Sequence, residues 1–148
     1  VTSFVNTAVA ECIPVLAQAQ IDSSASIDGY YVTPTLFGPV PRGNQLAKEE
    51  VFGPILSVIP FDDEADAVRI ANDTEYGLTA GVWTESGGRQ FRMGKALRCG
   101  QVFINCYGAG GGVELPFGGT KRSGFGREKG MEAFHDLTVC KTIIVKHD

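Results

Sequence analysis

The sequence predicts an α/β protein with a partial parallel sheet and a C-terminal β tail. Between residues 55 and 105 the pattern runs strand, helix, strand, helix, strand, an alternation typical of parallel sheets. Residues 106–130 then carry nine glycines, and residues 137–146 are rich in β-branched side chains. The chain has 148 residues, enough for one domain with its own core.

The first 36 residues predict a helix followed by a strand. Apolar residues recur at helical spacing over residues 2–18, although Pro14 should kink or end that helix near Ile13. Residues 29–36 are aromatic and β-branched, which favours a strand, and Pro34 favours the edge of a sheet.

The next two elements are a buried strand and a capped helix. Residues 55–59 form a short apolar run after a Gly-Pro turn, as expected for a buried strand. Asp62 or Asp63 can cap a helix over residues 64–72. The inner stripe of that helix is expected to consist of Ala65, Val68 and Ala71.

A second strand, helix and strand follow. Residues 77–84 read as a strand, and Ser86 can cap a helix that Gly100 closes. Residues 101–105 complete the alternation as a short strand. Beyond the glycine-rich segment we expect a short helix around residues 128–135.

Composition narrows the classes of function. A formal charge of −4 disfavours a broad nucleic-acid-binding surface, and the apolar runs are too short to span a membrane. The chain opens without a basic and then apolar leader, so we expect no signal peptide. Four widely spaced cysteines without a CxxC pair favour reduced thiols in a cytoplasmic protein over disulfides or a metal site. The start without methionine, inside a helical pattern, is what a fragment or processed product would have.

The pair Glu50 and Phe52 is the first candidate site. Residues two apart in an extended segment face the same side, and a turn at Gly53-Pro54 then directs the chain away. A carboxylate beside an aromatic ring suits a nicotinamide ribose, since the carboxylate can accept hydrogen bonds from vicinal hydroxyls. By spacing alone, an exposed glutamate beside a core phenylalanine is the commoner arrangement.

The glycine run at residues 108–112 does not form a known phosphate-binding motif. A P-loop ends in Gly-Lys-Ser/Thr, where this chain has Val113 and Glu114, and no GxGxxG occurs. The run therefore predicts a pocket loop. In the following segment, Arg127 is expected to anchor the loop through a carboxylate or backbone carbonyls, and Asn105 to hold neighbouring backbone with its amide.

Two motifs resemble the C-terminal part of the NAD(P)-dependent aldehyde dehydrogenases. They are Glu-Glu-Val-Phe-Gly-Pro at residues 49–54 and Pro-Phe-Gly-Gly-Thr-Lys-Arg-Ser-Gly-Phe-Gly-Arg-Glu at residues 116–128. The resemblance extends over nearly the whole chain. It implies the C-terminal portion of the catalytic domain over residues 1–136 and an oligomerisation strand over residues 137–148. It also implies a homo-oligomer, an aldehyde substrate and NAD or NADP as cofactor, without distinguishing the two.

The resemblance implies a role for individual residues. Glu50 would bind the nicotinamide ribose and Phe52 would pack against the nicotinamide ring. Glu128 would act as a proton relay to the general base. The substrate pocket would include Asn105, Tyr107, Gly110 and Phe117. The family's nucleophilic cysteine and general-base glutamate are expected upstream of Val1, so this chain alone should be inactive.

Two other classes of function stay open. An exposed tail strand would suit a non-catalytic assembly module, because its backbone groups need a partner strand. Val139 departs from the acidic residue that some family members carry, which removes a possible ion pair between subunits. Alternatively, Cys106 beside the glycine loop could serve a stand-alone thiol enzyme, which requires a lowered thiol pKa.

Overall fold

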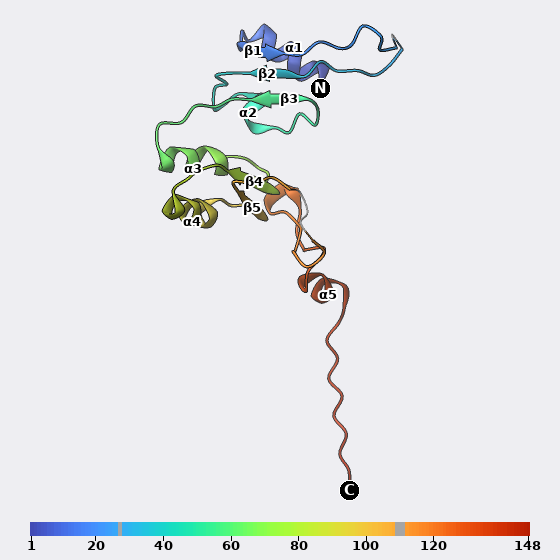
Figure 1. Ribbon diagram of the computed structural model, residues 1–148. Helices are drawn as coiled ribbons and strands as arrows, with labels where there is room; N and C mark the ends of the chain where they lie inside the picture. Colours follow the sequence, from blue (N-terminus) through green and yellow to red (C-terminus); the bar gives the residue numbers. More distant parts are fainter. Residues whose placement is uncertain (27, 109–111) are drawn as a thin grey trace. The chain divides into compact units, whose positions relative to one another are not determined.

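A computed structural model describes residues 1–26, 28–108 and 112–148. The chain forms two compact units, Val1–Thr74 and Glu75–Asp148, whose elements are labelled in Figure 1. Both units contain helices and a parallel pair of strands, which confirms the α/β class.

The first unit is built on a three-stranded sheet in the order β1–β2–β3. β1 (Val15–Gln18) pairs antiparallel with β2 (Thr35–Phe37), and β2 pairs parallel with β3 (Ile55–Ser57). Phe37 is fully buried at the centre of the core. The buried side chains around it are Ala8, Ile13, Val40 and Leu46.

Three predictions in this unit were wrong in extent. The buried strand expected over residues 55–59 is shorter, since β3 ends at Ser57, and it is not buried, since Leu56 is exposed. Helix α1 (Thr2–Ala10) ends well before residue 18, and the rest of the expected helix contains β1. Pro14 has no amide for a helical hydrogen bond and disfavours helical backbone in the residue before it, so the chain leaves the helix there. The strand expected over residues 29–36 is confined to β2, because the preceding residues have no ladder partner and Tyr30 is exposed.

The helices of the first unit begin at polar caps. α2 (Gln45–Lys48) was not predicted, although Asn44 caps it by accepting a hydrogen bond from the Leu46 amide at 2.9 Å. α3 (Glu64–Asn72) has the predicted bounds, and Asp63 Oδ1 accepts from the Asp66 amide at 2.8 Å. The predicted inner stripe was wrong, because Ala65 and Ala71 are exposed whereas Asp66 is buried.

Asp66 is buried because two arginines and a backbone amide satisfy its carboxylate. Arg42 Nη2 donates to Oδ2 at 2.5 Å, Arg69 pairs with Oδ1, and the Asp62 amide donates to Oδ2 at 3.2 Å. Burial alone would favour the neutral acid, but these hydrogen bonds and the charges of both arginines hold the pKa of Asp66 below its ordinary value. The network thereby ties α3 to the loop that follows β2.

The second unit contains the predicted strand, helix and strand. β4 (Thr79–Val82) and β5 (Gln101–Ile104) are parallel, and α4 (Gly87–Ala96) connects them. Ser86 caps α4 as predicted, and Val82, Met93 and Leu97 are buried. Gly100 does not close the helix, which ends at Ala96. The Gly100 amide instead donates to the carbonyls of Gly77 and Leu78, both at 3.1 Å.

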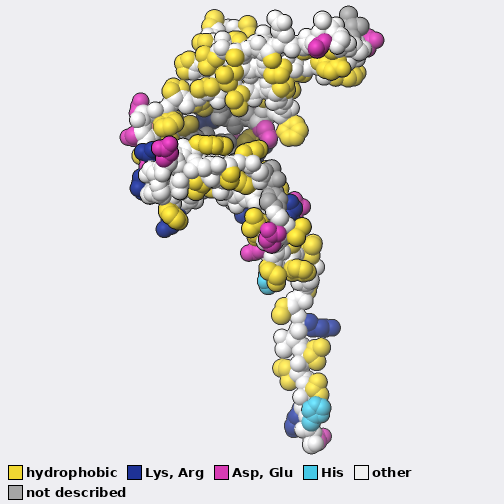
Figure 2. All heavy atoms as spheres, in the orientation of Figure 1, with side chains coloured by type: hydrophobic (Ala, Val, Ile, Leu, Met, Phe, Trp, Pro, Cys, Tyr) yellow, Lys and Arg dark blue, Asp and Glu magenta, His cyan; other side chains and the backbone are white. Residues whose placement is uncertain are grey.

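The chain after β5 contains a 3-10 turn, η1 (Lys121–Ser123), and a helix, α5 (Glu132–Leu137). The helix expected around residues 128–135 starts later because Glu128 is engaged in an antiparallel bridge with Phe117. Residues 138–148 follow α5 as an exposed segment with no helix or strand, and Figure 2 shows apolar side chains along it. Among the described residues, no helix has both the length and the apolar character that crossing a membrane requires.

Candidate cofactor and substrate site

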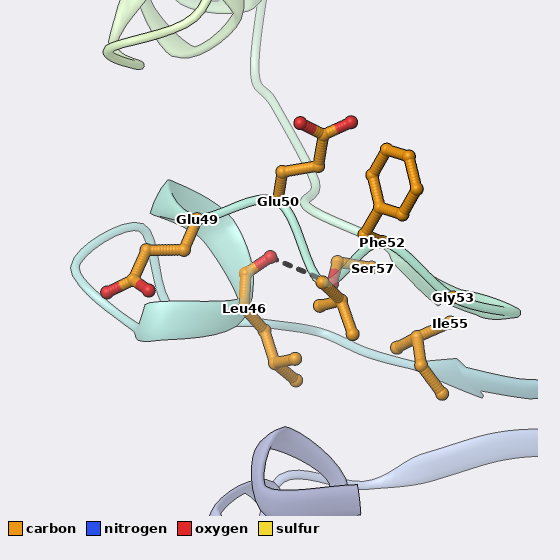
Figure 3. A pocket seen from close by; sticks show the side chains of 8 residues that line it. Leu46, Glu49, Glu50, Phe52, Gly53, Ile55 and Ser57 are labelled. Carbon is orange, nitrogen blue, oxygen red and sulfur yellow. Dashed lines mark hydrogen bonds between the residues drawn. The ribbon is translucent and has the colours of Figure 1, made fainter. Parts of the chain in front are cut away.

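An open groove of about 580 Å³ surrounds the loop between α2 and β3 (Figure 3). Leu46 and Ile55 form part of its apolar lining, and Ser57 Oγ donates to the Leu46 carbonyl at 3.0 Å. This hydrogen bond ties α2 to β3 and so holds both ends of the loop that carries Glu50 and Phe52. The loop that carries Glu50 and Phe52 is therefore anchored at both ends, and its residues line the groove.

Within this loop, Glu50 and Phe52 point to the same side, as the sequence predicted (Figure 3). Glu49 points elsewhere, and its Oε2 accepts a hydrogen bond from Gln45 Nε2 at 3.2 Å. The carboxylates of Glu49 and Glu50 thus point in different directions. Glu50 is the one that shares a face with the aromatic ring.

Phe52 is held in an unusual state for a large apolar residue. Its side chain is 87% exposed and its backbone φ is 51°, in the left-handed region that bulky residues rarely adopt. Strain of this kind costs on the order of 1–3 kcal/mol and persists only where the surrounding structure imposes it. An exposed ring on a constrained backbone is typical of a surface that packs against a ligand or another chain.

In the second unit, Phe117 and Glu128 form an isolated antiparallel bridge. The Phe117 amide donates to the Glu128 carbonyl at 2.7 Å, and the Glu128 amide donates back to the Phe117 carbonyl at 2.8 Å. Both residues line an open cavity of about 710 Å³ together with Arg127 and Asp136. The structure thus brings together the pocket-wall phenylalanine and the relay glutamate that the sequence singled out.

The prediction that Arg127 anchors the loop is confirmed. Arg127 Nη1 donates to the Gly119 carbonyl at 2.9 Å and to the Gly126 carbonyl at 2.6 Å. The Arg127 amide also donates to Asp136 Oδ2 at 2.7 Å. One side chain therefore joins the two ends of the loop that contains η1.

The side chain of Glu128 is exposed. The relay role required a partly buried carboxyl, because burial favours the protonated form. Atoms of this chain do not supply that burial, so the relay stays a prediction that depends on groups beyond these residues.

Asn105 holds neighbouring backbone with its amide, as predicted. Its Oδ1 accepts from the Thr84 amide at 2.8 Å and its Nδ2 donates to the Thr84 carbonyl at 2.9 Å. Its φ of 53° is a conformation that asparagine tolerates better than most residues. The side chain links the ends of β4 and β5 and directs the chain toward Tyr107. The roles of these two residues in a substrate pocket remain predictions.

Two other candidate residues follow Asn105. The Tyr107 ring is exposed, with its centroid 6.1 Å from that of Phe103. Gly110, the other pocket candidate, lies outside the described residues.

The cysteines are free thiols throughout. Cys106 is exposed, and Oδ1 and Nδ2 of the adjacent Asn105 are hydrogen-bonded to Thr84. Burial raises the pKa of Cys99, which makes that thiol a poorer nucleophile. Within the described ranges, no group of three or more His, Cys, Asp or Glu side chains is arranged to hold a metal ion.

Sequence reasoning missed Gln101 at the start of β5. Its Nε2 donates to the carbonyl of Pro116 at 3.0 Å, directly before Phe117. Its Oε1 is buried and accepts no hydrogen bond from the described residues. Nothing local in the sequence marks this residue, because the contact joins positions 15 residues apart.

Comparisons with known proteins agree with these motifs. Residues 1–143 match the model of the aldehyde dehydrogenase family. A betaine aldehyde dehydrogenase from Rhizobium leguminosarum is 39% identical over 145 residues, covering 98% of this chain and 30% of that protein. A crystal structure from Burkholderia cenocepacia is 52% identical with a TM-score of 0.93, covering 99% of this chain and 31% of the other.

A third relative has a cofactor bound. An indole-3-acetaldehyde dehydrogenase from P. syringae, crystallised as a mutant with NAD+ and IAA, is 42% identical with a TM-score of 0.81. The match covers 90% of this chain and 26% of that one.

The α/β units of this chain thus match one class of enzyme fold. This chain belongs to the aldehyde dehydrogenase family. It spans about 30% of the length of the curated relatives that it matches.

Proposed function

We propose that this chain is the C-terminal portion of the catalytic domain of an enzyme that oxidises an aldehyde to a carboxylic acid with NAD or NADP. Glu50 and Phe52 bind the nicotinamide riboside part of the cofactor, and Phe117 forms a wall of the aldehyde pocket. The main support is the constrained, exposed ring of Phe52, which shares a face with the Glu50 carboxylate above a groove.

The residues present fit this cofactor. A carboxylate can accept two hydrogen bonds from vicinal ribose hydroxyls, and charge-assisted hydrogen bonds are the stronger kind. A phenylalanine ring offers a flat apolar surface for the nicotinamide. The bound cofactor supplies the hydride acceptor, while Glu50 and Phe52 orient it. The P. syringae relative crystallised with NAD+ supports a nicotinamide cofactor.

Aldehyde oxidation in this family also needs a nucleophilic thiolate and a general base, which this chain does not supply. Tyr107 contributes to the aldehyde pocket together with Phe117. Asn105 holds the backbone before Tyr107 through its hydrogen bonds with Thr84. Glu128 moves a proton toward the base once other parts of the enzyme bury its carboxyl. Four free cysteines support a reducing, cytoplasmic location.

The chain alone should therefore produce no NADH from NAD and an aldehyde. Activity should return in a chimera, in which this chain replaces the matching segment of the wild-type P. syringae indole-3-acetaldehyde dehydrogenase. The assay is NADH absorbance with indole-3-acetaldehyde, on the isolated 148-residue chain and on the chimera.

The control is the P. syringae enzyme truncated before the replaced segment, which should also be inactive. Saturable turnover by the isolated chain would refute the proposed division of the active site. A folded, monodisperse chimera that binds no NAD would refute the cofactor assignment.

A second proposal concerns assembly, with residues 137–148 as the strand that pairs with another subunit in a homo-oligomer. Its support is the exposed, extended segment with apolar side chains at Val139, Ile143, Ile144 and Val145. An apolar segment with unpaired backbone groups favours β-pairing with another chain.

Deleting residues 138–148 from the chimera should therefore lower its mass by light scattering to that of a smaller assembly. Replacing Lys141 by alanine, a change that keeps the strand, should leave the mass unchanged. An unchanged mass after the deletion would exclude assembly through the tail.

A further inference from the structure

The segment that carries Phe117 is docked on the start of β5. A Cβ atom built on Gly100 would lie 1.6 Å from the Gly118 carbonyl oxygen, so the two backbones are in direct contact. One residue further, Gln101 Nε2 donates to the Pro116 carbonyl at 3.0 Å. The Gln101 hydrogen bond thus fixes the backbone directly before Phe117 to the sheet, and the Gly100 contact fixes the backbone directly after it.

The C-terminal side of Phe117 is fixed by Arg127. Its guanidinium donates to the Gly119 carbonyl, and Gly119 is itself buried. The same nitrogen holds the Gly126 carbonyl, next to the strand-like bridge between Phe117 and Glu128. Hydrogen bonds from a charged donor are about twice as strong as neutral ones, so Arg127 is the stronger of the two restraints.

The ring of Phe117 has a neighbour on one face. Lys129 Nζ lies 5.6 Å from the ring centroid, within the range of a cation–π contact. Because Lys129 follows the Glu128 bridge directly, its position depends on the same backbone pairing. The orientation of the Phe117 ring therefore depends on the backbone on either side of it, which Gln101 and Arg127 hold through the Pro116 and Gly119 carbonyls.

We propose that Gln101 and Arg127 are positioning residues that fix the Phe117 ring and thereby set which aldehydes the pocket accepts. This inference rests on the proposed role of Phe117 in the aldehyde site. Releasing either the Pro116 or the Gly119 carbonyl lets the Phe117 backbone shift. A ring free to occupy several positions discriminates poorly between aldehydes of different size.

The first test follows hydrogen exchange in the 148-residue chain and does not depend on turnover. The Phe117 and Glu128 amides, which donate across the bridge, should exchange about tenfold faster in Arg127→Met, the change expected when a hydrogen bond to a charged group is lost. Arg127→Lys, which keeps a charged donor, should restore part of the protection. The Asn105 amide, bonded to the Val82 carbonyl at 2.8 Å, is the internal control and should not change.

The second test measures selectivity in the chimera. Arg127→Met and Gln101→Leu should raise KM for indole-3-acetaldehyde more than they change kcat, with about a tenfold increase for Arg127→Met. The preference for indole-3-acetaldehyde over acetaldehyde should fall in both variants. In a Phe117→Ala background neither substitution should alter that preference further, because residues that act through one side chain are not additive.

Two results would overturn the inference. One is unchanged exchange of the Phe117 and Glu128 amides in Arg127→Met. The other is a selectivity change that persists in full without the Phe117 ring. If the exchange result holds and the chimera still lacks turnover, the restraint on Phe117 stands and the proposed enzymatic function is at fault.

Discussion

Replacing Glu50 by glutamine in the chimera should lower kcat/KM for NAD by about 10- to 100-fold, the equivalent of losing charge-assisted hydrogen bonds. The amide is neutral and has one acceptor oxygen, so it cannot offer a separate charged oxygen to each of the two hydroxyls as a carboxylate does. The adjacent Glu49→Gln is the matched control and should stay within about twofold. Glu49 points away from Phe52 and accepts from Gln45 instead.

Initial rates at varied NAD concentration, with the aldehyde saturating, measure this effect. Glu50→Asp should fall between the wild type and Glu50→Gln, because it keeps the charge on a shorter arm. Equal losses for Glu49→Gln and Glu50→Gln would mean that the loop tolerates neither change, and that Glu50 has no specific role. A Glu50→Gln chimera with wild-type kinetics would exclude this residue from the cofactor site.

The second large effect concerns stability, at the contact between Gly100 and the Phe117 segment. Gly100→Ala should lower the free energy of unfolding by about 1–3 kcal/mol or more, as overpacking does in a site that cannot relax. The new methyl group would collide with the backbone carbonyl of Gly118, which cannot rotate away as a flexible side chain would.

Gly94→Ala is the matched control within α4. The nearest side-chain atom to its Cβ position is Ile104 Cδ1 at 3.8 Å, an ordinary contact. Because alanine is favoured over glycine inside a helix, the free energy of unfolding of this variant should rise by up to about 1 kcal/mol. Urea denaturation of both variants measures the difference. If Gly100→Ala matched the wild type, the docking of the Phe117 segment on β5 would be wrong.

The parts of the fold that could be predicted are those whose signals are local. Asp63 and Ser86 provide side-chain caps, so α3 and α4 begin where the sequence indicated. The helix expected over residues 2–18 failed because the apolar spacing continues past Pro14 while the backbone cannot. The strand expected over residues 29–36 failed because aromatic composition does not provide a partner strand.

In the candidate site, too, local sequence signals could be predicted and contacts between distant segments could not. Glu50 and Phe52 share a direction as predicted, although the φ of 51° at Phe52 departs from the extended backbone on which the prediction rested. Asn105 was singled out by its place at the end of a strand, but its partner Thr84, 21 residues earlier, was not. The contact of Gln101 with Pro116 depends on how two segments pack, which no local pattern encodes. The relay predicted for Glu128 requires a buried carboxyl, and the described residues leave its side chain exposed.

A crystal structure of the chimera with NAD is the decisive experiment for the cofactor assignment. This assignment requires the Glu50 carboxylate to lie about 2.5–3.0 Å from the nicotinamide ribose hydroxyls, with the Phe52 ring against the nicotinamide. A cofactor bound elsewhere, with the Glu50 carboxylate surrounded by solvent, would contradict it.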